Sequence, residues 1–220
     1  MDKIKIILLI FIIIILAIVA FSQKSYFQKT STTKEYNIIT TTENNKLPSK
    51  QVFVSPINNP LSRITKKPFG IYISSTNSPV SPEKFTGYHT GVDFEIYPTE
   101  KDEDVSVRAI CGGKILQKHQ ARGYGGMVVQ SCTIDNNSVT IVYGHIKLSS
   151  MKIAVGDTLN AGDFLAFLGQ EFSVETDGER KHLHLGIHKG STIDTRGYVQ
   201  TKDELENWID IQKFLFPPID

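Results

Sequence analysis

The sequence of 220 residues predicts an all-β fold, a compact antiparallel β-sandwich or barrel-sandwich-like domain, with a short C-terminal helix and an N-terminal transmembrane helix. Three observations carry this prediction. Short runs of alternating apolar and polar residues, broken by Gly, Asp and Asn, fill the region after residue 60. No long segment with helical periodicity separates them. A continuous apolar segment lies close to the N-terminus.

The apolar segment, about residues 6–21, contains no polar residue and has lysines on both sides. At 1.5 Å per residue it spans roughly 24 Å, slightly less than the roughly 30 Å hydrocarbon core of a bilayer. Residues 1–22 are therefore predicted to be a signal anchor or a signal peptide. The long isoleucine-rich run favours the anchor, although "AFS" is an acceptable cleavage site. Either way the rest of the chain is expected outside the cytoplasm, as a single-pass membrane protein or, after cleavage, secreted.

Residues 23–59 are rich in Ser, Thr, Lys and Asn and show no sustained period. Such a composition buries too little apolar surface to offset the entropy of ordering the chain. We predict a flexible polar tether over this range, followed by one domain over residues 60–220.

Five segments of the domain read as strands, and "DNNS" reads as a tight turn between the second and the third. They are "VRAICGGKILQ", "GGMVVQSCTI", "SVTIVYGHI", "DTLNAGDFLAFLG" and "HLHLGIH". The repeated Gly-Asp turn in "VGDTLNAGDFLAFLG" is also typical of lipoyl and biotinyl carrier domains. However, no lysine occupies a hairpin tip in the context that a carrier requires.

The predicted C-terminal helix covers about residues 202–215. Thr201 and Glu204 have the spacing of a capping box, and Leu205, Trp208 and Ile209 follow with helical spacing. "FPPID" ends the helix.

Composition narrows the choice of partners. The net charge of +1 and the absence of a basic stripe give no indication of a nucleic-acid partner. Two cysteines are too few for a disulfide-rich miniprotein or a Cys-based zinc module.

The histidines carry the chemical signal. On a strand, His182 and His184 share one face, while the leucines between them point to the other. "HTGVD" adds His89 and Asp93 four residues apart, and "VYGH" adds His145. A catalytic zinc takes three protein ligands and leaves a position open for water. His89, Asp93 and one histidine of the His182/His184 pair fill that requirement.

In this order, "HTGVD", "VYGH" and "HLH" resemble the LytM and lysostaphin-type zinc metallopeptidases, which cut peptides of bacterial peptidoglycan. "KPFG", "GYGGMVV" and "VGDTLNAGDFLAFLG" extend the resemblance to roughly residues 63–190. It implies that His89, Asp93 and His184 bind one Zn²⁺ per chain. By the same resemblance, His145 and His182 are catalytic histidines that do not ligate the metal.

No His-Glu-x-x-His motif supplies a glutamate base, so one of His145 and His182 is expected to act as the general base and the other to stabilise the oxyanion. Tyr88 is a weaker candidate for an oxyanion donor. "GQEFSVETDGERK" lacks the short Gly-Thr-Gly-like turn found in the family, and its charged loop is expected to reshape the substrate groove. His119 and His188 have no counterpart in the pattern and are interpreted as structural.

Cys111 and Cys132 lie in consecutive predicted strands, which could bring them within range of a disulfide. Export favours the disulfide, and two buried thiols are the alternative.

Together with the apolar segment 6–21, the resemblance leads us to expect a membrane-tethered, monomeric zinc endopeptidase that hydrolyses cross-bridges or stem peptides of peptidoglycan in cell-wall remodelling. A catalytically silent module of the same fold, which binds cell wall or activates another hydrolase, is the alternative. The presence of all five site residues favours the enzyme. The sequence does not distinguish glycyl bridges from D-amino-acid cross-links.

Overall fold

The computed structural model describes residues 53–215, and strands dominate this part of the chain. The strands are β1 (Tyr72–Ile73), β2 (Gly87–His89), β3 (Gly91–Glu95), β4 (Ser106–Arg108), β5 (Gly113–Ala121), β6 (Gly125–Ile134), β7 (Asn137–Gly144), β8 (Ile146–Lys147), β9 (Thr158–Leu159), β10 (Phe164–Leu168), β11 (His182–Lys189) and β12 (Tyr198–Val199). The α-helices are α2 (Lys202–Leu205) and α3 (Gln212–Leu215). Short 3-10 helices cover Pro60–Arg63, Pro98–Glu100, Leu148–Ser150 and Val174–Thr176.

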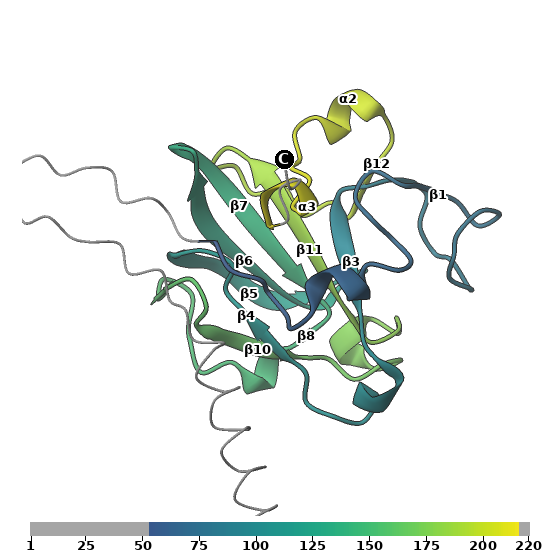
Figure 1. The fold of residues 1–220 in the computed structure, drawn as a ribbon, viewed down its shortest axis with the longest axis horizontal. Coiled ribbons are helices and arrows are strands. Elements are labelled where there is room, and N and C mark those ends of the chain that lie inside the picture. The colour runs from purple at the N-terminus through teal and green to yellow at the C-terminus, as the bar shows by residue number, and fades with distance from the viewer. Residues whose placement is uncertain (1–52, 216–220) are drawn as a thin grey trace, which may run out of the picture. The chain divides into compact units, whose positions relative to one another are not determined.

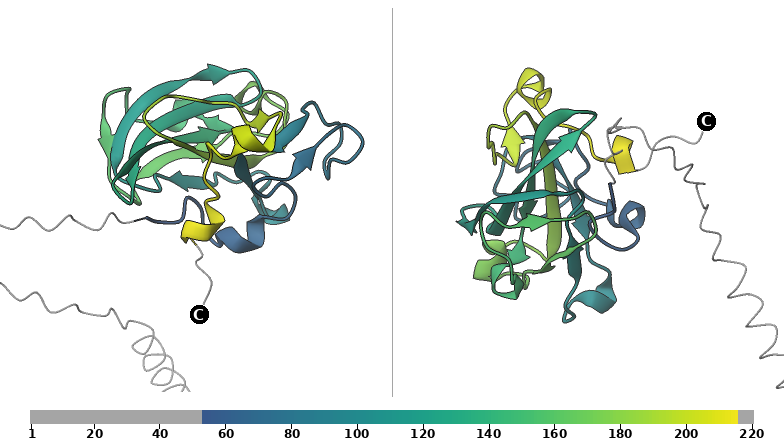
Figure 2. Two further views of the ribbon diagram at one scale, coloured as in Figure 1. Left: turned by 90° about the horizontal axis from the view of Figure 1, so that it is seen from above. Right: turned by 90° about the vertical axis from the view of Figure 1, so that its left-hand side faces the viewer.

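The strands form three sheets. The largest has six antiparallel strands in the order β3-β11-β7-β6-β5-β9, and the two smaller sheets have the orders β4-β10-β8 and β1-β2-β12. β4, β8 and β10 lie beside the lower part of the large sheet (Figure 1), and the two views of Figure 2 show how strongly the large sheet curves. The predicted all-β fold is confirmed for the described residues.

The main core lies between the large sheet and the β4-β10-β8 sheet. Val107 and Leu165 of the small sheet belong to the same buried apolar cluster as Ile141, Leu183 and Leu185 of the large sheet. Because side chains alternate along a strand, the residues on the opposite face of β11 and β7 do not belong to this core and can include polar side chains.

The predicted tight turn joins β6 to β7. Ile134 pairs with Asn137, so Asp135 and Asn136 form a two-residue loop, with φ values of 47° and 64°. Positive φ at both positions is the requirement of a type I′ turn, and Asn and Asp tolerate it better than other side chains.

Cys111 and Cys132 form a disulfide, with their Cα atoms 6.2 Å apart, as the sequence predicts. Cys132 lies on β6, and Cys111 lies two residues before the start of β5, the neighbouring strand.

Two predicted strands are each divided in the structure. The segment "VRAICGGKILQ" becomes β4 and β5, and "DTLNAGDFLAFLG" becomes β9 and β10. In both cases the two halves belong to different sheets. A chain that passes from one sheet to the other leaves the hydrogen-bond ladder of the first sheet before it joins that of the second. A single continuous strand is therefore impossible.

The single helix predicted over about 202–215 is wrong in its continuity. The capping box of Thr201 and Glu204 forms as predicted, but α2 ends at Leu205. The backbone of Asn207 and Ile209 then bonds to β11, with Lys189 N–H donating to Asn207 O at 2.8 Å and Ile209 N–H donating to Ile187 O at 2.9 Å. These residues extend the sheet beyond the end of β3, so their backbone groups are unavailable to a helix.

The domain also begins earlier than predicted. Val54 N–H donates to Ile110 O, and Arg108 N–H donates to Pro56 O, each at 2.9 Å. Ile57 is 1% exposed and belongs to the core. Residues 53–59 therefore pack on the domain, and the part of the predicted tether that includes them is wrong.

Within residues 53–215, none of the helices has the length and apolarity that crossing a membrane requires. The predicted membrane segment 6–21 lies outside the described residues, as does most of the predicted tether.

Candidate metal centre and active site

Three neighbouring strands place the predicted ligands. On β11, His184 lies on the sheet face opposite the core, and its direct partner on β3 is Asp93. His89 ends β2, and Thr90 alone separates it from β3. The short connection between β2 and β3 brings His89 to the same place although it belongs to another sheet.

The three side chains converge on one point. His89 Nε2 lies 3.0 Å from His184 Nδ1, and Asp93 Oδ1 lies 3.2 Å from the first nitrogen and 3.1 Å from the second. Each of the three residues is at most 3% exposed. Among the described residues, this is the group of His, Cys, Asp and Glu side chains that could hold a metal ion.

The hydrogen bonds at the far sides of the rings fit a metal. His89 Nδ1 lies 3.3 Å from Pro68 O, which only accepts, so Nδ1 carries the proton and Nε2 presents a lone pair. His184 Nε2 faces the hydroxyl of Tyr124 at 3.4 Å, which fixes the other ring. Two imidazole nitrogens and one carboxylate oxygen are a donor set that zinc prefers in catalytic sites.

The charges agree with this donor set. Burial raises the pKa of Asp93, but His182, His89 and the hydrogen bonds from His182 and His184 outweigh burial and hold it well below its usual range. Burial lowers the pKa of His184 to about 4, although Asp93 opposes the shift. A charged carboxylate and a neutral imidazole are the forms that bind metal ions.

His145 and His182 lie next to each other beside this group, with ring centroids 4.2 Å apart. His145 has φ of 61°, and its own backbone bonds to Tyr124 O and Gly169 N hold that conformation. Its Nδ1 lies 3.3 Å from Thr176 O. Burial is the main cause that keeps the pKa of His145 well below its usual value, and His182 adds to it.

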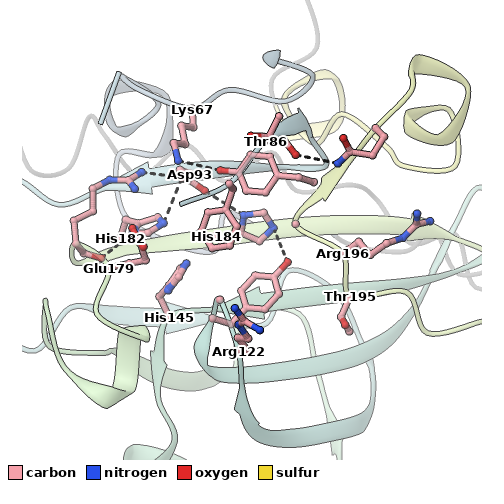
Figure 3. A pocket seen from close by; sticks show the side chains of 17 residues that line it. Lys67, Thr86, Asp93, Arg122, His145, Glu179, His182, His184, Thr195 and Arg196 are labelled. Carbon is pink, nitrogen blue, oxygen red and sulfur yellow. Dashed lines mark hydrogen bonds and ion pairs between the residues drawn. The ribbon is translucent and has the colours of Figure 1, made fainter. Parts of the chain in front are cut away.

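A cavity of about 330 Å³ opens over these residues (Figure 3). Asp93, His145, His182 and His184 lie on its wall. The rest of its lining is Lys67, Phe85, Thr86, Arg122, Gly123, Tyr124, Glu179, Arg180, Thr195, Arg196, Gly197, Tyr198 and Gln200. Four of the predicted site residues, Asp93, His145, His182 and His184, thus line one cavity.

Lys67 and Tyr198 form one wall of the cavity. Lys67 Nζ donates to the Tyr198 hydroxyl at 3.0 Å and pairs with Glu83 at 2.6 Å, and both charged side chains are buried. The Tyr198 ring lies 5.1 Å from the ring of His89. Lys67 thus holds Tyr198 in place, and the Tyr198 ring packs against the ring of His89.

Gly144 makes room for the opposite wall. A Cβ atom at this position would lie 2.3 Å from Cδ1 of Tyr124 and 3.4 Å from Cβ of His184. Because any side chain at position 144 would overlap the Tyr124 ring, only glycine there lets Tyr124 lie against β7 and reach His184.

The tyrosines at the cavity differ from the one that the sequence suggested. Tyr88 lies between the inward residues of β2, packs against Tyr72 with a centroid distance of 4.9 Å, and does not line the cavity. The structure therefore does not bring Tyr88 to this cavity, and its role as an oxyanion donor stays a prediction. Tyr124 and Tyr198 line the cavity instead, and neither was predicted as a site residue. The "GYGG" motif was the available signal for Tyr124.

The two remaining histidines lie away from the metal group. His119 is exposed on β5. His188 packs on Trp208 and faces Thr192 O at 3.2 Å. Their interpretation as structural residues agrees with these positions. Glu179 and Arg180, from the charged loop before β11, line the cavity.

The sequence is similar to that of a known protein family. Residues 87–195, about half of the chain, match the model of "Peptidase family M23". Endolysin 2638A of Staphylococcus phage 2638A is 30% identical over 101 residues, which are 46% of this chain and 19% of the endolysin. The alignment thus spans about a fifth of that relative.

Solved structures with similar folds include LytU and lysostaphin from Staphylococcus simulans. LytU is 23% identical with a TM-score of 0.47, over 69% of this chain and 83% of its own. Lysostaphin is 19% identical with a TM-score of 0.45, over 74% of this chain and 53% of its own. The five predicted metal and catalytic residues all lie within the range that the family model matches.

Proposed function

Because the chain belongs to peptidase family M23, we propose that it is a zinc-dependent endopeptidase that hydrolyses peptide bonds in cross-bridges or stem peptides of bacterial peptidoglycan. One observation carries the proposal. The donor atoms of His89, Asp93 and His184 lie within 3.2 Å of one another at a cavity that two further histidines also line. A silent module of the same fold would not need this complete set.

His89, Asp93 and His184 would hold one zinc ion. When bound, zinc polarises a carbonyl group and lowers the pKa of a water molecule. The chain's own residues must orient the peptide, take up the proton of the water and stabilise the charge on the carbonyl oxygen.

We assign the general base to His145. Its Nδ1 proton is directed to Thr176 O, so the neutral ring carries its lone pair on Nε2. Burial favours the neutral form. A neutral imidazole held in one orientation can accept the proton of the attacking water.

We assign charge stabilisation to His182. Its Nδ1 lies 2.8 Å from Arg180 O and its Nε2 lies 3.3 Å from Asp93 Oδ2, so acceptor oxygens orient both nitrogens of the ring. Such a ring beside the cavity stabilises negative charge on the carbonyl oxygen. The hydroxyl of Tyr124 is a second donor on the same wall.

Digestion of chemically defined muropeptides, followed by mass spectrometry, tests the function and identifies the bond. We expect the full-length chain in detergent to release peptides only with zinc, and a chelator to stop the reaction until zinc is restored. His145→Ala should lower the rate by about 10²- to 10⁴-fold with unchanged zinc content. If the zinc-loaded chain cleaves none of these substrates and His145→Ala behaves identically, the silent cell-wall-binding or activating module is the better description.

We also propose that the protein is a monomer held at the membrane by residues 6–21, with the peptidase domain outside the cytoplasm. Cell fractionation and N-terminal sequencing test this location. An intact N-terminus in the membrane fraction supports an anchor, and a soluble chain that begins after Ser22 supports a cleaved signal peptide.

A further inference from the structure

We propose that Arg180 is a positioning residue that holds Asp93 as a one-oxygen ligand of the metal. The inference rests on the proposed zinc site. It concerns a side chain outside the motifs "HTGVD", "VYGH" and "HLH", in the loop where the sequence departs from the family pattern.

Strand periodicity places Arg180 near the site. Residues 180, 182 and 184 have the same parity as the chain enters β11, so the side chain of Arg180 lies on the same face as the two histidines. On β3, Asp93 and Glu95 share a face for the same reason, and they pair with His184 and His182. Arg180 thus lies two residues before His182 on the same face, next to the group formed by His182, His184 and the two carboxylates of β3.

Arg180 binds both carboxylates of β3. Its Nη2 lies 2.7 Å from Asp93 Oδ2 and 2.6 Å from Glu95 Oε1, and its Nε donates to both oxygens of Glu95 at 3.0 Å. The planar guanidinium can make these bonds at once because its donors form a fixed fork.

Because these side chains are buried, the two carboxylates need the guanidinium of Arg180 between them. The side chains of Asp93, Glu95 and Arg180 are 3%, 10% and 14% exposed. Two carboxylates on one buried face repel each other unless a cation lies between them. Lys66 also approaches Glu95, at 3.5 Å, but its side chain is 41% exposed and does not reach Asp93.

The two oxygens of Asp93 therefore have different partners. Oδ1 faces His89 and His184, whereas Oδ2 faces Arg180 and His182. A metal bound through both oxygens would compete with Arg180 and His182 for Oδ2. Arg180 thereby fixes the orientation of Asp93 and limits it to one ligand atom, which leaves more of the coordination sphere for water and substrate.

Cobalt binding tests the inference without relying on activity. We would replace zinc by Co²⁺ in the full-length chain and in Arg180→Met, and measure both the affinity and the visible absorption spectrum. We expect Arg180→Met to weaken Co²⁺ binding by about 10- to 100-fold, as loss of a group that orients a metal ligand does. The spectrum should lose intensity, because an Asp93 that binds through two oxygens raises the coordination number.

Two further variants separate orientation from folding. Arg180→Lys keeps the charge but lacks the fork, and we expect affinity between those of the wild type and Arg180→Met. Glu95→Gln should shift affinity in the same direction by a smaller factor, because Glu95 acts only by holding Arg180. Arg108→Met is the matched control, since Arg108 lies on β4 and its guanidinium bonds to Asn58.

The outcomes are distinct. Unchanged affinity and spectrum in Arg180→Met, with wild-type metal binding intact, overturn the inference and leave the proposed function standing. If the wild type binds neither Co²⁺ nor Zn²⁺, the proposed function itself fails. Should Arg180→Met not fold, Arg180→Lys decides, and a wild-type spectrum and affinity in that variant overturn the inference.

Discussion

The two faces of β11 are buried to the same degree but are held in place differently. Leu183, Leu185 and Ile187 on the core face are at most 1% exposed, and His182 and His184 on the other face are 2% and 3% exposed. The leucines and the isoleucine are stabilised by removal of apolar surface from water. The histidines are stabilised only by specific partners, since a buried polar group without a hydrogen bond costs free energy.

Burial alone therefore does not identify a core. The apolar face tolerates changes that preserve volume, and the polar face tolerates changes that preserve donors and acceptors. Variants on the two faces should therefore fail in different measurements.

The largest expected effect is on the polar face. His184→Ala removes one of three metal ligands, and we expect hydrolysis to fall to background and bound zinc to fall below one equivalent per chain. The free energy of unfolding of the metal-free chain should change much less. His188→Ala, on the same strand but outside the metal group, is the control and should retain zinc. Full zinc content in His184→Ala would show that another residue is the ligand.

On the apolar face, Leu185→Ala should reverse the pattern. It leaves a cavity in the main core, and we expect a loss of about 2–5 kcal/mol in the free energy of unfolding. Zinc content and turnover per folded molecule should stay close to wild type. Val155→Ala, at a site 57% exposed, should change stability by about 0.5 kcal/mol or less. Denaturant titration measures both, and a zinc-free but stable Leu185→Ala would contradict the separation of the faces.

Loss of the disulfide should also act on stability alone. Cys111 and Cys132 are 21 residues apart in sequence. Opening a loop of this length lowers the free energy of unfolding by about 3 kcal/mol. Thermal unfolding with and without a reductant measures the change, and zinc content measured at low temperature should be unaffected. A parallel loss of zinc would show that the core face and the metal group are coupled.

The smallest expected effect is that of Tyr124→Phe. The variant removes the hydroxyl that faces His184 Nε2 at 3.4 Å but keeps the ring against Gly144. Because this contact is long, we expect metal affinity to fall by no more than about 10-fold. Competition with a chelator measures it. A larger loss would mean that the hydroxyl fixes the imidazole more strongly than the distance suggests.

The alternation along β11 could be predicted from the sequence because strand geometry has a period of two. His89, Asp93 and His145 could be assigned through the family resemblance; the structure brings His89 next to Asp93, and it places Asp93 and His145 on one cavity. The hairpin at Asp135 and Asn136 was predictable because only a few residue types adopt two consecutive positive φ values.

The partners of these residues could not be predicted. Arg180 meets Asp93 across 87 residues of sequence, and no local pattern encodes such a contact. Tyr124 replaces Tyr88 as a site residue because strand parity turns Tyr88 away, and the start of β2 at Gly87 fixes that parity. The break in the C-terminal helix has the same origin, since Trp208 pairs with His188 on a strand that is distant in sequence.

The packing of residues 53–59 also determines where the chain can be cut. Proteolysis before residue 53 leaves every described hydrogen bond of the domain intact. Cleavage after Asn59 would remove Ile57 from the core and the carbonyl of Pro56 from Arg108. We expect limited digestion to produce a stable fragment that begins before Val54, and a recombinant domain that begins at Pro60 to unfold at a lower temperature than one that begins at Pro48.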